Sequence, residues 1–447
     1  MPNFSFGRFA APAPTSYHLA IGHLLERRYP ELWERFASRE LRATATADIG
    51  LALARRAAPL GLLDAPQLYE AAGEISRAMG LEAPIRLYQG DPSAGLKRNA
   101  ALYFDPEHVH IVFEGDLLER LEPAAFWYVI GHELAHHRLW TAENGRIWTA
   151  HRLLCWAADA CDSAAAFQTT ARNEKLYTEI FADRYGLWAS GDLDAALNAH
   201  AMIISTEADV SGAAYLAASE QALAECAANR DDIERVPEGI VRAALLAEWA
   251  RHPSASEARA RTLIEGSSPI ERLDLLSQER LADITHWMLY EFLGDPWRRR
   301  ELIQAHAALI SETLAEAIMR PRSDLDSDAD LDPLHAAISN AHNSVQRYLA
   351  YLLLDFTTVD PQIEDLILVA ALQFAHDFGL GPVFRTIASQ ELKITKTKLD
   401  QRERNADEIL ARADLILGDA AKTEPSPTDP HPGETPVVTP QAMGAGR

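Results

Sequence analysis

Two histidines and a glutamate near residue 132 form the most informative pattern in this 447-residue chain. His132, Glu133 and His136 stand in the order His-Glu-x-x-His. Residues four apart share one face of a helix, so the two imidazoles can bind one metal ion. Zinc binds neutral imidazole nitrogens at about 2.0–2.1 Å, and the adjacent glutamate can take a proton from a zinc-bound water. The alternative is a helix at the edge of the core with two spare histidines.

The residues around this motif predict the helix that must position it. Pro123 fits the first turn of a helix, where its missing N–H costs nothing. Apolar residues recur at four-residue spacing from Phe126 to Leu134 and can face a core. Asn144-Gly145 is a turn signal. We therefore expect a helix from about Glu122 to Trp140.

A second helical segment offers carboxylates for the same metal ion. Glu179 and Asp183 are four residues apart and share a helical face. One carboxylate can bind zinc while the other accepts the N–H of a zinc-bound imidazole and fixes its tautomer. Alternatively, the pair is part of a charged surface. His137 points away from the two motif histidines and is interpreted as structural, whereas His151 can lie near the site without any signal that places it there.

The order of these motifs resembles that of the HtpX and CAAX prenyl protease family of gluzincin metallopeptidases (peptidase family M forty-eight). Glu179-x-x-Ala-Asp183 begins 43 residues after His136. Upstream, Asn99-Ala100 is similar to the Asn-Ala edge strand of the family. Downstream, His252-Pro253 is similar to its His-Pro motif, although the following arginine comes one residue later than in the family. The resemblance covers about residues 66 to 265.

The resemblance implies a role for each matching residue. His132, His136 and Glu179 would bind one zinc ion per chain, Glu133 would be the general base, and Asp183 would orient a zinc-bound histidine. The remaining roles concern the substrate: Asn99 and Ala100 would bind an extended polypeptide along the edge strand, and His252 would stabilise the oxyanion.

Composition narrows the class of partner. The formal net charge of −23 disfavours nucleic acids and anionic membranes, because both require a basic surface. No stretch approaches the roughly 20 apolar residues of a membrane span, unlike the best-known family members, which are integral membrane enzymes. The three cysteines form no disulfide framework, and the N-terminus has no signal-peptide pattern. A cytoplasmic location is therefore expected.

The predicted fold class is α+β and predominantly helical, with a zincin-like core, a small β-sheet and an all-α C-terminal domain. Strands are expected at 84–88, 100–104 and 109–113, and an alanine-rich helix at 43–60. The predicted domains are an N-terminal helical support (1–65), a metallopeptidase domain (66–265), a helical domain of unknown role (266–418) and a disordered tail (419–447).

These patterns lead to one main functional expectation and one alternative. The main expectation is a zinc-dependent endopeptidase that uses a metal-activated water and a glutamate base. The alternative is a helical interaction or regulatory protein with a structural or latent zinc site. In either case the helices of residues 266–418 offer a surface for a protein partner or an oligomer contact.

Overall fold

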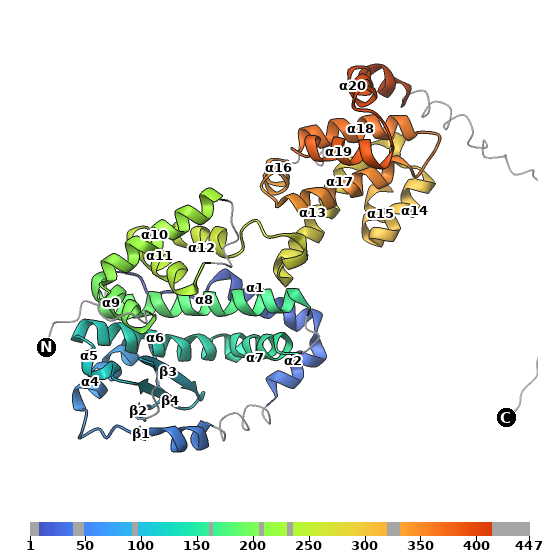
Figure 1. Cartoon of the computed structure of the whole chain (residues 1–447). Coiled ribbons are helices and arrows are strands. Elements are labelled where there is room, and N and C mark those ends of the chain that lie inside the picture. Colours follow the sequence, from blue (N-terminus) through green and yellow to red (C-terminus); the bar gives the residue numbers. More distant parts are fainter. Residues whose placement is uncertain are drawn as a thin grey trace, which may run out of the picture. The chain divides into compact units, whose positions relative to one another are not determined.

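The protein is described by a computed structural model that covers residues 9–38, 49–91, 97–160, 164–204, 210–229, 236–319 and 331–413 (Figure 1). The chain divides into two compact units. The first contains Met1–Asp283 and Ala341–Val345, and the second contains Ile284–Asn340 and Gln346–Arg447. A predominantly helical chain with one small sheet confirms the predicted α+β class.

The sheet of the first unit has four strands in the order β1-β2-β4-β3. Their bounds are β1 (Ala57–Pro59), β2 (Ile85–Gly90), β3 (Asn99–Phe104) and β4 (Val109–Glu114). β2 and β4 pair in parallel, whereas β3 forms an antiparallel hairpin with β4 and stands at the end of the sheet. The three strands predicted from the sequence are confirmed, and so is the hairpin.

β1 corrects the sequence-based expectation for residues 43–60. The helix that was predicted there ends at residue 56, and Ala57–Pro59 pairs with β2 instead. Alanine favours a helix, but Pro59 cannot continue one because it lacks an N–H and its ring obstructs the preceding turn. Hydrogen bonding with β2 therefore decides the conformation of this short segment.

The helices of the first unit pack on the sheet and on one another. Their bounds are α1 (Ser16–Arg28), α2 (Pro30–Ala37), α4 (Pro66–Ala78), α5 (Leu117–Arg120), α6 (Pro123–Thr141), α7 (Arg146–Ala158), α8 (Ala165–Ser190), α9 (Leu193–Ile204), α10 (Gly212–Asn229), α11 (Glu238–Arg251) and α12 (Ser256–Ile264). Val109, Ile111 and Phe113 of β4 are fully buried in the core that includes α6. Helix α6 agrees closely with the predicted range.

Helices α6 and α8 lie side by side along the middle of this unit (Figure 1). Two glycines set their closest approach. A Cβ atom on Gly131 would lie 2.6 Å from the Ala189 Cβ, and one on Gly186 would lie 2.6 Å from Cδ2 of Tyr128. The helices are thus in backbone contact at the residue directly before His132.

The N-terminal segment belongs to the same compact unit as the sheet and α6. Helix α1 packs against α7 and α8, and Tyr17 Oη donates a 2.8 Å hydrogen bond to Asp274 Oδ2. The division between the two units falls at Asp283. The predicted domain limits at residues 65 and 265 and the predicted supporting role of the first helices stay predictions.

The second unit is helical throughout its described residues. Its bounds are α14 (Glu301–Ile310), α15 (Glu312–Met319), α16 (Asp332–Ser339), α17 (Asn343–Thr357), α18 (Glu364–Asp377), α19 (Gly381–Glu391) and α20 (Lys396–Arg404), and α13 (Leu275–Leu293) crosses the division between the units. The tail predicted for 419–447 lies outside the described residues. Across the described helices, none combines the length and apolarity that crossing a membrane requires.

The close approach of α6 and α8 generates a prediction for Gly131→Ala. Overpacking a helix contact costs about 1–3 kcal/mol, which outweighs the roughly 1 kcal/mol that alanine gains over glycine in a helix. We expect a lower urea midpoint for this variant. Gly73→Ala is the matched control, because nothing lies within 4 Å of a Cβ at that position in α4; it should be neutral or stabilising. Equal stability of the two variants would contradict the packing argument.

Candidate metal centre

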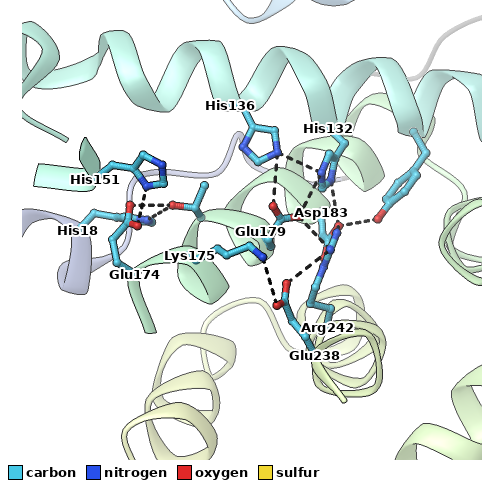
Figure 2. Close-up of polar contacts among 12 residues, drawn as sticks. His18, His132, His136, His151, Glu174, Lys175, Glu179, Asp183, Glu238 and Arg242 are labelled. Carbon is cyan, nitrogen blue, oxygen red and sulfur yellow. Dashed lines mark hydrogen bonds and ion pairs between the residues drawn. The ribbon is translucent and has the colours of Figure 1, made fainter. Parts of the chain in front are cut away.

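The predicted metal ligands converge between α6 and α8 (Figure 2). The Nε2 atoms of His132 and His136 lie 3.2 Å apart. Glu179 places Oε2 at 3.5 Å from His132 Nε2 and Oε1 at 3.9 Å from His136 Nε2. The three side chains are thus brought together with donor atoms within 4.8 Å of one another.

This donor set fits a zinc ion. Ligand atoms about 2.0–2.1 Å from a tetrahedral ion lie about 3.3 Å apart. The separations of 3.2 Å between the histidines and 3.5 Å from His132 to Glu179 are close to this value, whereas His136 lies 3.9 Å from the other Glu179 oxygen. Two imidazole nitrogens and one carboxylate are also ligands that zinc accepts. His132, His136 and Glu179 would therefore hold the ion. No fourth protein donor joins them among the described residues.

Asp183 lies directly behind His132, one helical turn after Glu179. Its Oδ1 atom is 3.0 Å from His132 Nδ1 and accepts a 2.7 Å hydrogen bond from the Tyr128 hydroxyl. The carboxylate can thus accept the Nδ1 proton of His132, which leaves Nε2 as the metal-binding nitrogen. The role predicted for Asp183 requires this proximity and stays a prediction.

Arg242 of α11 joins both carboxylates. Its guanidinium donates to both oxygens of Asp183 at 2.9 and 2.7 Å, and its Nη1 atom lies 2.9 Å from Glu179 Oε2. A planar guanidinium suits such bidentate pairing. Arg242 contacts the Oε2 atom of Glu179, whereas the Oε1 atom of Glu179 faces His136.

Charge and burial set the protonation of this cluster. Burial favours neutral carboxyls, but Arg242 and the imidazoles hold the pKa values of Glu179 and Asp183 well below their usual range. Burial also opposes charging His132, yet Asp183 and Glu179 raise its pKa to about 10. For His136, burial dominates and lowers the pKa to about 4. The cluster thus combines ionised carboxylates with one neutral imidazole.

Glu133 faces the sheet rather than α8. Its side chain is buried, and the Leu102 backbone of β3 forms a hydrogen bond with it. Burial raises the pKa of Glu133 to about 7, although the charge of His132 opposes the shift. This carboxyl therefore links α6 to the edge strand β3.

A cavity of about 560 Å³ opens over these groups. Its wall includes both predicted substrate-binding residues, Asn99 and Ala100 of β3. Trp140, Ile203 and Ile204 give it apolar surface. The same space is therefore bounded by the metal-ligand set, by Glu133 and by the edge strand. These lie together as the sequence motifs suggest.

The other histidines have different positions. His252 is exposed at the C-terminal end of α11 and is absent from the cavity wall, so the structure does not bring it to the site. His137 points to the sheet, where its Nε2 atom donates to the Asp105 carbonyl oxygen at 3.0 Å. His151 lines the cavity, and its Nδ1 atom lies 2.8 Å from the buried Glu174 carboxylate.

Arg242 and Tyr128 are the site residues that sequence reasoning missed. Arg242 lies on α11, in an alanine-rich part of the chain that carries no recognisable motif. The available signal was a lone arginine between Val241 and Ala243, since a charged side chain on an apolar helix requires a partner. Tyr128 stands four residues before His132 and therefore on the same helical face.

Comparison with known proteins assigns this chain to no family. The chain matches no protein-family model, and no curated protein or solved structure is significantly similar to it. The resemblance to the HtpX and CAAX prenyl protease family therefore stays a prediction.

The buried pairing of Arg242 predicts a large effect for Arg242→Met. Removing one partner of a buried ion pair leaves an uncompensated charge and costs about 3–5 kcal/mol. We expect this loss in urea unfolding. Arg251→Met on the same helix is the matched control, because Arg251 and its partner Glu220 are half-exposed (50% and 47%); its cost should stay within about 1 kcal/mol. Similar small losses in both variants would contradict the role of Arg242.

Proposed function

We propose that this protein is a zinc-dependent endopeptidase. One observation carries the proposal: the His132, His136 and Glu179 donors, the Glu133 carboxyl and the edge of β3 border a single cavity. Peptide hydrolysis needs these three components, namely a metal ion, a base for the water proton and a surface for an extended chain. The motif order that resembles the HtpX and CAAX prenyl protease family supports the same reaction.

The chemistry divides between the ion and the protein. When bound, zinc lowers the pKa of a coordinated water toward about 7 and polarises the scissile carbonyl. Glu133 takes a proton from the attacking water while the water oxygen bonds to the carbonyl carbon. Glu133 then gives this proton to the amide nitrogen as the carbon–nitrogen bond breaks. The products are a carboxylic acid and an amine, and Glu133 returns to its starting state.

The groups behind the metal ligands keep them in place. The Asp183 carboxylate lies 3.0 Å from His132 Nδ1, and Arg242 holds that carboxylate through two hydrogen bonds. A ligand held by such partners loses less freedom when it binds the ion. We assign no oxyanion role to His252, because it does not line the cavity.

The substrate class follows from β3. It is the terminal strand of the sheet, and its residues Asn99 to Leu102 line the cavity. An edge strand can pair with an extended polypeptide through main-chain hydrogen bonds. Trp140 and the two isoleucines of α9 would then contact apolar substrate side chains. We therefore expect an unfolded or extended segment to be cleaved rather than a compact domain.

The alternative function is an interaction or regulatory protein whose zinc ion is structural or latent. Structural zinc sites are usually closed by four protein ligands. Three ligands beside a cavity, with a carboxyl next to them, favour the enzyme. The proposed location is the cytoplasm, because the sparse cysteines agree with a reducing compartment. The second unit would offer the contact surface for a protein partner or for another copy of the chain.

Glu133→Gln tests the base. Glutamine keeps the size of the side chain but cannot take a proton, so turnover of a fluorogenic peptide library should fall about 100- to 10,000-fold. Zinc content by elemental analysis should stay near the wild-type value, because Glu133 is not a ligand. Glu179→Ala, purified in parallel, should lose the zinc of this site. Undiminished cleavage by Glu133→Gln would reject Glu133 as the base, and a wild type that holds zinc without any turnover would favour the alternative function.

A further inference from the structure

Three metal-binding side chains meet outside the candidate active site, at the turn between β3 and β4. Asp105 follows β3, His108 precedes β4 and His110 lies within β4. Their donor atoms lie within 4.8 Å of one another. Asp105 and His110 are buried, whereas the His108 side chain keeps 30% exposure. The function proposed above makes no use of this cluster.

Two distances within this cluster are compatible with ligands of one ion. Oδ2 of Asp105 lies 3.2 Å from His108 Nδ1 and 3.8 Å from His110 Nε2. A hydrogen bond can explain the shorter distance but not the longer one. Ligand atoms of a tetrahedral zinc ion are about 3.3 Å apart, so one ion between the three groups fits both distances.

Neighbouring groups hold two of the ligands in a binding orientation. Oδ1 of Asp105 accepts a 2.9 Å hydrogen bond from the Glu107 backbone N–H, which leaves Oδ2 directed at the histidines. Nδ1 of His110 lies 3.0 Å from the Tyr88 hydroxyl of β2. If that nitrogen carries the proton, the lone pair of Nε2 faces the carboxylate. Two electron-rich atoms facing each other favour a cation between them. Two imidazoles and one carboxylate form a donor set suited to zinc and its neighbours in the transition series.

We propose that Asp105, His108 and His110 bind a second zinc ion, which fixes the β3–β4 hairpin. The ion would join the turn to β4 through side chains alone. The turn is also linked to α6, because the Asp105 carbonyl accepts from His137, the residue after His136. Phe104, the last residue of β3, packs on the rings of His137 and Trp140. The second ion would therefore steady the end of the strand that borders the cavity.

The main test counts zinc ions in four proteins: wild type, His108→Ala, His136→Ala and the double variant. Each is equilibrated with excess zinc, desalted and measured by elemental analysis. We expect about two ions in the wild type, about one in each single variant and none in the double variant. His376→Ala is the control, since this side chain is 86% exposed and belongs to neither cluster; it should keep both ions.

The outcomes separate this proposal from the proposed function. One ion that is lost in His136→Ala but kept in His108→Ala would refute the second site and leave the first intact. One ion with the opposite pattern would support the hairpin site and refute the first. Circular dichroism shows whether each variant is folded. If His108→Ala is not, Asp105→Asn replaces it, because asparagine can still accept from the Glu107 N–H while losing the charge.

Tyr88→Phe tests the orientation of His110 without removing a ligand. Loss of the hydroxyl should weaken zinc binding at the hairpin about 10- to 100-fold, as is typical for a partner behind a ligand. The measurement is zinc titration in the His136→Ala background, where only the hairpin site remains. Unchanged affinity would overturn the assigned role of Tyr88, and absence of any zinc binding in this background would overturn the second site itself.

Discussion

The close contact of α6 with α8 is the constraint on which the candidate site depends. Gly131 and Gly186 lack side chains where the helices meet, and a Cβ on either would collide with the opposite helix. His132 follows Gly131 directly, and Asp183 precedes Gly186 by less than one turn. Two donors on one helix and one on its neighbour can share an ion only when the backbones come this near. The close packing of α6 and α8 is therefore a precondition for a shared metal ion between these side chains.

Burying so many charges between two helices requires compensation, and Arg242 provides it. Isolated carboxylates in this position would take up protons, since burial alone favours their neutral forms. Arg242 pairs with both, and its own pKa is held well above the ordinary value. The raised pKa of His132 means that this ring binds two protons when no metal competes. Zinc would replace the proton on Nε2, so metal binding and protonation are coupled at this residue.

The sequence predicted local features better than contacts between distant segments. The His-Glu-x-x-His helix, the β3–β4 hairpin and the Glu179–Asp183 face each depend on a few neighbouring residues, and each is present. Arg242 was missed because its partners lie about sixty residues away on another helix. β1 was missed because its conformation depends on pairing with β2. The role predicted for His252 depended on a distant contact in the same way. A two-residue motif can indicate a helix end, but it does not determine the direction in which that end packs.

The β3–β4 hairpin connects two groups of side chains that could each hold a metal ion. One group lies at its own turn, and the other lies on helices α6 and α8. Asp105 presents its side chain to His108 and His110, while its carbonyl accepts from His137 on α6. A shift of the turn would therefore move both the hairpin cluster and the end of the helix that carries His136. The backbone and the side chain of Asp105 thus couple the edge strand to helix α6. An ion held at this turn would affect the cavity through the position of β3, without contacting the groups of α6 and α8 that line the cavity.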